Sequence, residues 1–293
     1  ARSWDNVAYQ APYYLIVASA GNHRGVEPPD GTSDEEIFLF DDSEWKKLSD
    51  LSGVNRPIKD GGNEGYDSLA GFNLSKNVLS VGAVDGTGNN FFVNSSWGPT
   101  DDGRIKPDVV AKGVGVISPT ALNDTDYSSG SGTSFSAPMI AGSAALLTEH
   151  QENLFPGKLL FSSTLRGLIA HTATNKGEEG PDYQYGWGLM NTQKAAEVMS
   201  NNAINNQIHI RELTIKDGQT LEFQVKAIGD EPLRTSIAWT DPPVASSNIV
   251  AFGTLDDRSS RLVNDLDLSL STTGSPTDYL PYTLDPLNPD LVA

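Results

Sequence analysis

The sequence lacks cysteine, long hydrophobic runs and an abundance of histidine, and each absence excludes some chemistry. Without cysteine the chain has no disulfides, no thiolate metal ligands and no cysteine nucleophile. The apolar runs fall well short of the roughly 20 residues that a membrane-spanning helix needs, so we expect no membrane insertion. With only 4 histidines, every candidate for a general base can be considered individually.

Basic residues are scarce as well. The chain has 38 Asp and Glu against 20 Lys and Arg, which gives a net charge of −18. Nucleic acid is therefore excluded as a partner, because phosphate binding needs clustered Lys and Arg. The acidic excess favours solubility, and it also suits an extracellular or calcium-binding protein.

The 293 residues suggest two domains. Within residues 1–203, buried strands and helices alternate, which predicts an α/β domain with a parallel sheet. The predicted strands lie within 13–22, 77–85 and 105–119. One predicted helix begins at Ser134, and two others cover 159–173 and 191–200. The polar stretch at about 23–65 predicts a surface insertion with a helix around Glu44–Leu51.

The pattern changes near residue 204. From there to residue 293, short alternating strands are separated by turn signals such as "KDGQ" and "GDEP". This pattern is typical of an all-β module. We expect a β-sandwich domain at 204–293, and we expect it to be incomplete.

Ser134 follows the loop "GSGT" and begins a predicted helix. Free N–H groups and the dipole at a helix start favour negative charge, so a nucleophile placed here would form its oxyanion beside a backbone donor. Pro138 fits a first helical turn. The helix is small and apolar on every side, which predicts that it is buried all round.

Three alternatives remain open for this loop on its residues alone. A phosphate-binding loop would need the Lys of a Walker motif, which is absent. A hydrolase elbow would need Gly where Ser136 stands. Ser134 could also simply cap the helix.

Several motifs in order resemble those of subtilisin-like serine proteases, the subtilases. They are "VASAGN" at 17–22, "SVGAVD" at 80–85, "SSWGPTDDGRIKPDVVA" at 95–111, "GTSFSAP" at 132–138 and "YGWGLMNTQKAAE" at 185–197. The phrases "AWTDPP" and "LVNDLDL" are similar to those of the sandwich domain in large secreted bacterial members. The resemblance therefore implies the C-terminal part of a subtilisin-like three-layer α/β domain, followed by a partial, jelly-roll-like sandwich.

The resemblance also implies roles for individual residues. Ser134 would be the acyl-accepting nucleophile, Asn22 would donate its side-chain amide to the oxyanion, and Thr133 would support that site. Phe135 stands where the family often has Met. The residues implied to line one wall of the pocket for the substrate side chain are Ser19, Ala20 and Gly21.

The family's catalytic Asp and His precede the asparagine loop, and here only Asp5 and no histidine precede Asn22. His23 follows Asn22 and is expected to share its loop, whereas His150, His171 and His209 are expected to be surface or capping residues. "DGTG" at 85–88 is expected to be a tight turn. We therefore expect a fragment of a longer protease. The alternatives are a second chain that supplies Asp and His, a non-catalytic peptide-binding pseudo-protease, and an α/β phosphate-binding domain.

The expected activity is cleavage of extracellular proteins by a secreted bacterial endopeptidase through an acyl-enzyme. Protein or peptide substrates would be its partners, and the chemistry requires no cofactor. The resemblance implies a structural calcium ion, for which oxygen ligands are suited. The candidate ligands in the β module are Asp241, Asp265 and Asp267.

Overall fold

A computed structural model gives the arrangement of most of the chain. The described residues are 1–24, 38–41, 44–47, 66–69, 71–205, 209–227, 229, 232–245, 258–272 and 278–291. Their helices are α1 (Arg2–Gln10), α2 (Thr133–Leu154), α3 (Ser162–Thr172) and α4 (Thr192–Ile204), with a 3-10 turn at Gly71–Leu74. None of the helices in these ranges is long and apolar enough to cross a membrane.

Three strands form the parallel sheet that the sequence predicts. β1 (Val17–Ser19), β4 (Leu79–Val84) and β5 (Val109–Lys112) lie side by side in that order. Val17 pairs with Leu79, and Val81 pairs with Val109. All six residues of the central strand β4 are buried, as expected for a parallel strand covered on both faces.

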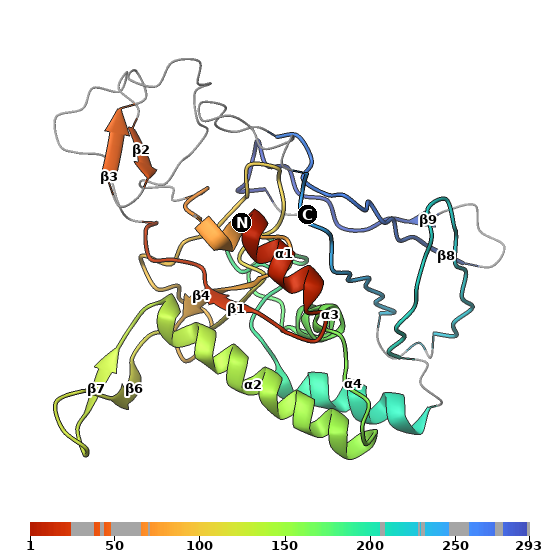
Figure 1. The fold of residues 1–293 in the computed structure, drawn as a ribbon, viewed down its shortest axis with the longest axis horizontal. Coiled ribbons are helices and arrows are strands. Elements are labelled where there is room, and N and C mark those ends of the chain that lie inside the picture. The colour runs from red at the N-terminus through yellow and green to blue at the C-terminus, as the bar shows by residue number, and fades with distance from the viewer. Residues whose placement is uncertain are drawn as a thin grey trace.

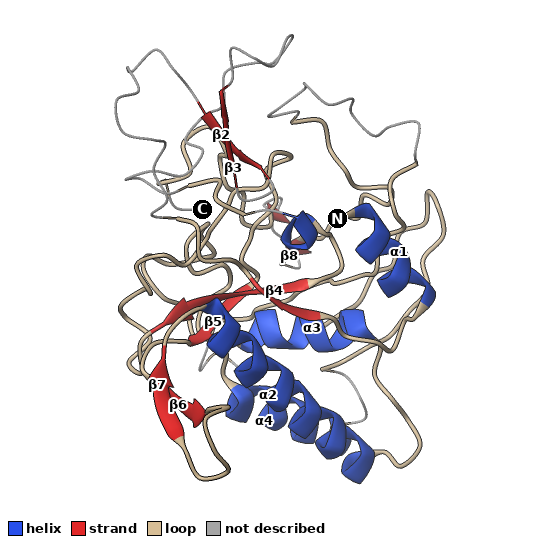
Figure 2. Cartoon of the chain, turned by 60° about the vertical axis from the view of Figure 1, so that its left-hand side comes forward, coloured by secondary structure: helices blue, strands red, loops and turns tan. Residues whose placement is uncertain are grey.

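Helices cover both faces of this sheet, which gives three layers (Figures 1 and 2). On one face, Leu79 shares a core with Ile140 of α2 and Ile169 of α3. On the other face, Val78 packs against Ala8 of α1. Val78 directly precedes β4 and Leu79 is its first residue, so adjacent residues of the chain contribute to the two cores. The predicted α/β architecture is confirmed, although α1 itself is not predicted.

The predicted helix in the insertion is wrong where the structure describes it. Glu44–Lys47 forms the strand β3, which pairs antiparallel with β2 (Phe38–Asp41), and residues 48–51 lie outside the described residues. The segment contains the helix-favouring residues Glu, Lys and Leu. Helix propensity is a weak prior, and pairing with a neighbouring strand overrides it here.

The prediction that α2 is buried all round is also wrong. Ile140 and Leu147 are buried, but Met139 and Leu146 are 42% and 61% exposed. The small, apolar composition of the helix does not reveal which side is covered. Within the described part of the chain, α2 therefore presents an apolar face to solvent.

The predicted sandwich is not seen in the described residues after α4. Segments 209–227 and 232–245 contain no strand, and the strand pairing in this described region is that of β8 (Leu270–Ser271) with β9 (Asp278–Tyr279). A lone two-stranded pair is marginal in water. The sandwich and the domain division at residues 203 and 204 thus stay predictions.

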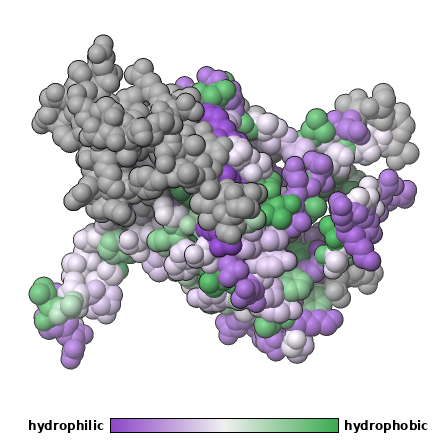
Figure 3. Space-filling model, turned by 45° about the horizontal axis from the view of Figure 1, so that its top comes forward, coloured by the Kyte–Doolittle hydropathy of each residue, from purple (hydrophilic) through white to green (hydrophobic). Residues whose placement is uncertain are grey.

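An antiparallel hairpin stands away from the body just before α2 (Figure 3). Its strands are β6 (Val116–Pro119) and β7 (Tyr127–Gly130). Ile117 and Tyr127 are 73% and 62% exposed. The hairpin therefore adds exposed apolar surface close in sequence to Ser134.

Candidate active site

Ser134 lies at the start of α2, as the sequence predicts. It is the second helical residue and is exposed. Gly132, the N-cap residue two positions earlier, has a φ of 149°, which suits a residue without Cβ. Pro138 lies in the second turn rather than the predicted first turn. Because proline has no N–H, the Ser134 carbonyl lacks its helical partner. The Ser134 side chain is thus exposed at the positive end of the helix dipole.

Asn22 and Thr133 are joined by two hydrogen bonds. The backbone N–H of Thr133 donates to Asn22 Oδ1 at 2.9 Å, and Thr133 Oγ1 donates to the same oxygen at 3.0 Å. Thr133 Oγ1 accepts the N–H of Gly21 at 3.2 Å. Thr133 therefore holds the amide oxygen of Asn22, and the amide nitrogen of Asn22, Nδ2, is left as a donor. A Cβ at Gly132 would lie 3.4 Å from this nitrogen, so glycine keeps the space beside it open.

Two buried residues that the sequence analysis does not single out hold the loop around Asn22. The N–H of Ser96 donates to the Gly21 carbonyl at 2.9 Å, and Ser96 Oγ accepts the backbone N–H that follows Asn22 at 3.1 Å. Asn73 Nδ2 donates to the Ala20 carbonyl at 3.1 Å. The sequence signal for Ser96 is its place in "SSWGPT", and no sequence signal marks Asn73.

The three residues predicted to line a substrate pocket are fixed to the sheet. Ser19 ends β1 and pairs with Val81. The N–H of Ala20 donates to the Val81 carbonyl at 2.9 Å. Gly21 has φ 113°, which turns the chain toward Asn22. Their contact with substrate stays a prediction.

Phe135 lies against the end of β7. A Cβ at Gly130 would fall 2.2 Å from Phe135 Cζ, so the ring fills the space that a side chain at position 130 would need. The residue after Ser134 is therefore packed against the hairpin.

The Ser134 hydroxyl makes no hydrogen bond with any described residue. His23 is exposed and follows Asn22. The other histidines bond side chains elsewhere: His150 to Ser200, His171 to Ser236 and His209 to Asn205. The described structure thus brings Asn22 and Thr133 together beside Ser134, and it brings no base to the Ser134 hydroxyl.

Asp85 forms the tight turn that the sequence predicts. Its carboxylate accepts the N–H and hydroxyl of Thr87 at 2.9 and 2.7 Å, and Asn90 Nδ2 at 2.7 Å. These bonds, first from Thr87 and then from Asn90, lower the pKa of Asp85. The carboxylate is satisfied within its own loop.

The candidate calcium ligands do not gather into a site. Asp241 is buried and forms an ion pair with Lys76, whereas Asp265 and Asp267 are exposed. No group of three or more His, Asp or Glu residues within the described ranges could hold a metal ion. These residues therefore do not fit a calcium ion, and structural calcium stays a prediction.

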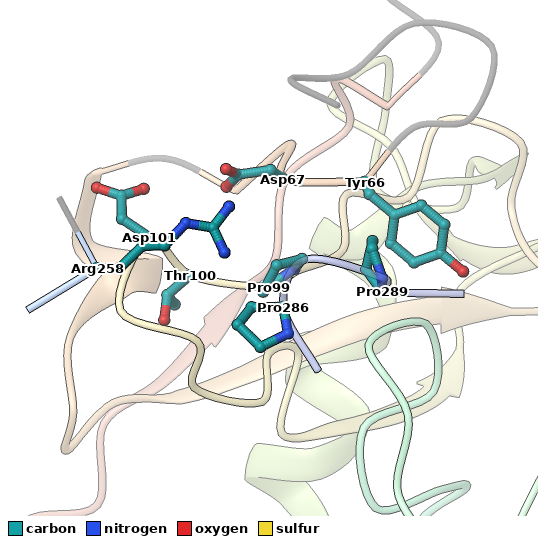
Figure 4. A pocket seen from close by; sticks show the side chains of 8 residues that line it. All are labelled: Tyr66, Asp67, Pro99, Thr100, Asp101, Arg258, Pro286 and Pro289. Atoms are coloured by element: carbon teal, nitrogen blue, oxygen red, sulfur yellow. The ribbon is translucent and has the colours of Figure 1, made fainter. Parts of the chain in front are cut away.

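A small pocket lies between residues 99–101 and the C-terminal segment, by which we mean the described residues from 209 to 291 (Figure 4). Burial, and then the neighbouring Asp102, raise the pKa of Asp101 at its edge. The pocket is lined by Tyr66, Asp67, Pro99, Thr100, Asp101, Arg258, Pro286 and Pro289. None of the predicted site residues is among them, so this pocket is separate from the residues around Ser134.

The family model described as the subtilase family, Peptidase_S8, matches residues 2–188. C5a peptidase of Streptococcus pyogenes is 44% identical over 85 residues, which cover 29% of this chain and 7% of that protein. Serine protease AprX of Bacillus subtilis is 31% identical over 156 residues, which cover 46% of this chain and 33% of that protein. The solved structure of the Clostridium perfringens CspB protease matches with a TM-score of 0.43 and 27% identity, covering 46% of this chain and 30% of that one. The chain thus spans a third or less of the curated relatives described here.

Proposed function

Because the chain belongs to the subtilase family, we propose that it carries the nucleophile and the oxyanion donor of a serine endopeptidase. Ser134 Oγ would attack the peptide carbonyl carbon, and the acyl-enzyme would form on this oxygen. The observation that supports this role is the Thr133–Asn22 pair. It holds the amide oxygen and leaves Nδ2 without a hydrogen-bond partner among the described residues, beside the start of the helix that bears Ser134.

The oxyanion of the tetrahedral intermediate would accept hydrogen bonds from Asn22 Nδ2 and from the Ser134 backbone N–H. Donors fixed before the reaction stabilise the developing charge without reorganising, and removing one such donor costs about 10²–10³ in kcat. Ser19, Ala20 and Gly21 would form one wall of the pocket for the preceding substrate side chain. Their small size suits a large apolar or aromatic side chain.

We place the general base and its orienting carboxylate outside the described site, on a further segment of the protein or on a second chain. Two exposed features support this. β4 is the sole described partner of β1, so the other edge of β1 is unpaired among these residues. Met139 and Leu146 of α2, which packs on the same sheet, are exposed. An unpaired strand edge beside an apolar helix face is the kind of surface that another strand and helix would cover.

The substrates would be proteins or peptides, cleaved outside a bacterial cell. The acidic composition and the similarity to proteases of Streptococcus pyogenes and Bacillus subtilis support this assignment. Residues 204–293 would form the partial β-sandwich. No cofactor would take part in the chemistry.

A fluorophosphonate probe, which labels activated serines, tests the function. In the product of the complete gene, labelling should occur at Ser134 and disappear in Ser134→Ala. The 293-residue chain alone should label far more slowly, because an unassisted serine hydroxyl is a poor nucleophile. Peptide binding without labelling of the complete protein would indicate a non-catalytic homologue and overturn the protease assignment.

A further inference from the structure

The ammonium group of Lys76 is buried where the residues that precede β4 meet residues 239–242 and 261–264. Nζ donates to the Asp241 carboxylate, to the Pro242 carbonyl at 2.6 Å and to the Arg261 carbonyl at 2.9 Å. An ammonium ion has three N–H donors and no acceptor. Each donor of Lys76 therefore has an oxygen partner.

The carboxylate of Asp241 is equally satisfied. Besides Lys76, it accepts the backbone N–H groups of Val263 and Asn264, each at 2.8 Å. The side chains of Lys76 and Asp241 are each only 3% exposed. Burying charge without a partner is strongly unfavourable, so such groups persist only when paired and hydrogen-bonded.

Asn77 and Arg166, two further residues that lie close to Lys76, bind the same stretch of backbone. Asn77 accepts the Asp241 N–H at 2.9 Å and donates to the Asp241 carbonyl at 2.8 Å. Arg166 donates to the carbonyl of Trp239 at 2.6 Å and to that of Lys76 at 2.8 Å. Residues from four separate parts of the chain, 76–77, 166, 239–242 and 261–264, thus meet here, and they include two cations, Lys76 and Arg166.

One carboxylate and two carbonyl oxygens around a positive charge form the kind of donor set that hard metal ions use. We propose that Lys76 supplies the built-in cation of this site, in place of a metal ion. Its ammonium group joins two loops of the C-terminal segment, 239–242 and 261–264, and fastens them to the residues that precede β4. We call Lys76, Asp241 and the two loops that they join the clamp. Asp241, a candidate calcium ligand by sequence, is the anion of this clamp.

Chemical rescue in the full 293-residue chain tests the proposal. Lys76→Ala removes three methylenes and the ammonium, which together correspond to n-propylammonium. The substitution should lower the thermal midpoint, and propylammonium should restore it in a saturable manner. 1-Propanol, which has the same shape without charge, should not. Equal restoration by 1-propanol would show that the site needs volume and not charge. Stabilisation of the unsubstituted chain by calcium, lost in Asp241→Asn, would show that the cation of this site is a metal ion. Either result overturns the proposal.

A second measurement leaves Lys76 unchanged, so it holds even if Lys76→Ala does not fold. During brief treatment with acetic anhydride, Lys76 should react at least tenfold more slowly than the exposed Lys112 and Lys216. Asp241→Asn should remove this protection. Lys106, which is buried and bonded to Asp108, is the control for folding. It should stay protected in Asp241→Asn, and that protection would show that the variant is folded. Reaction of Lys76 at the rate of Lys112 in the unsubstituted chain would contradict the clamp.

Discussion

Thr133 links the helix that bears Ser134, the proposed nucleophile, to the loop that bears Asn22, the proposed oxyanion donor. Its hydroxyl donates to Asn22 and accepts from Gly21, so Thr133→Val keeps the shape of the side chain and removes both bonds. We expect fluorophosphonate labelling of Ser134 in the complete protein to slow by about tenfold, less than the loss of an oxyanion donor itself. The unpaired polar groups should also reduce stability by about 1–3 kcal/mol.

Thr133→Ser is the matched control, because it retains the hydroxyl and should retain most of the labelling rate. Labelling that is equally fast in Thr133→Val and in the unsubstituted protein would show that Thr133 does not position Asn22.

Single residues differ in how far sequence alone identifies them. Ser134 and Asn22 lie in short motifs whose local chemistry suggests a role, and the structure places the two motifs in contact. Asn73 reaches the carbonyl of Ala20 across 53 positions. A side-chain bond to a distant backbone carbonyl leaves no periodicity or motif, so the sequence could not predict it.

At the scale of elements, two helical glycines provide a test of packing. A Cβ at Gly167 of α3 would lie 2.7 Å from the Cβ of Ala238, whereas a Cβ at Gly142 of α2 would meet nothing within 4 Å. Gly167→Ala should therefore destabilise the chain by about 1–3 kcal/mol through overpacking. Gly142→Ala should stabilise it by up to about 1 kcal/mol, because alanine favours a helix. Urea unfolding of both variants measures the difference, and equal effects would contradict the close contact of α3 with the C-terminal segment.

The exposed face of α2 gives a second test at this scale. If a further strand or helix covers it in the complete protein, Leu146→Glu should greatly reduce labelling of Ser134 there. The same substitution should leave the stability of the 293-residue chain nearly unchanged, because Leu146 is already 61% exposed. Leu122→Glu in the hairpin loop is the control, since Leu122 is 83% exposed. Unchanged labelling in the complete Leu146→Glu protein would argue that the face stays open.

The elements that sequence predicted well are those with a strong local signal. The apolar run at 77–85 contains β4, because a strand buried on both faces has an almost continuous apolar sequence. The segment around Glu44 has no such run, and its helix-favouring residues were misleading. The exposed side of α2 could not be predicted, because a helix of small apolar residues has no polar face to mark it.

Across the whole molecule, His171 should make stability depend on pH. It lies in the last turn of α3, and its Nδ1 forms a hydrogen bond with the Ser236 hydroxyl. Burial first, then Arg234 and Lys194, lower the pKa of His171 below its usual 6.5. The unfolded chain therefore binds this proton more readily, so the stability is full above pH 6.5 and falls as the pH drops through the lowered pKa. Thermal unfolding between pH 5 and 7.5 should show this loss, and His171→Gln should reduce it; an identical loss in that variant would assign it to other groups.

The sequence divides the chain into two domains near residue 204, but the contacts cross that boundary. Lys76 and Arg166, which precede residue 204, donate to the backbone carbonyls of Pro242 and Trp239, respectively. A change in the hydrophobic pattern along the sequence indicates where the type of secondary structure changes. It does not show which surfaces pack together. A chain that ends at Asn205 should therefore lose more thermal stability than Lys76→Ala, because it leaves both cations without their acceptors. A chain that ends at Thr272 keeps those acceptors and should lose less thermal stability than the chain that ends at Asn205. Full stability of the chain that ends at Asn205 would show that residues 1–205 do not depend on the C-terminal segment.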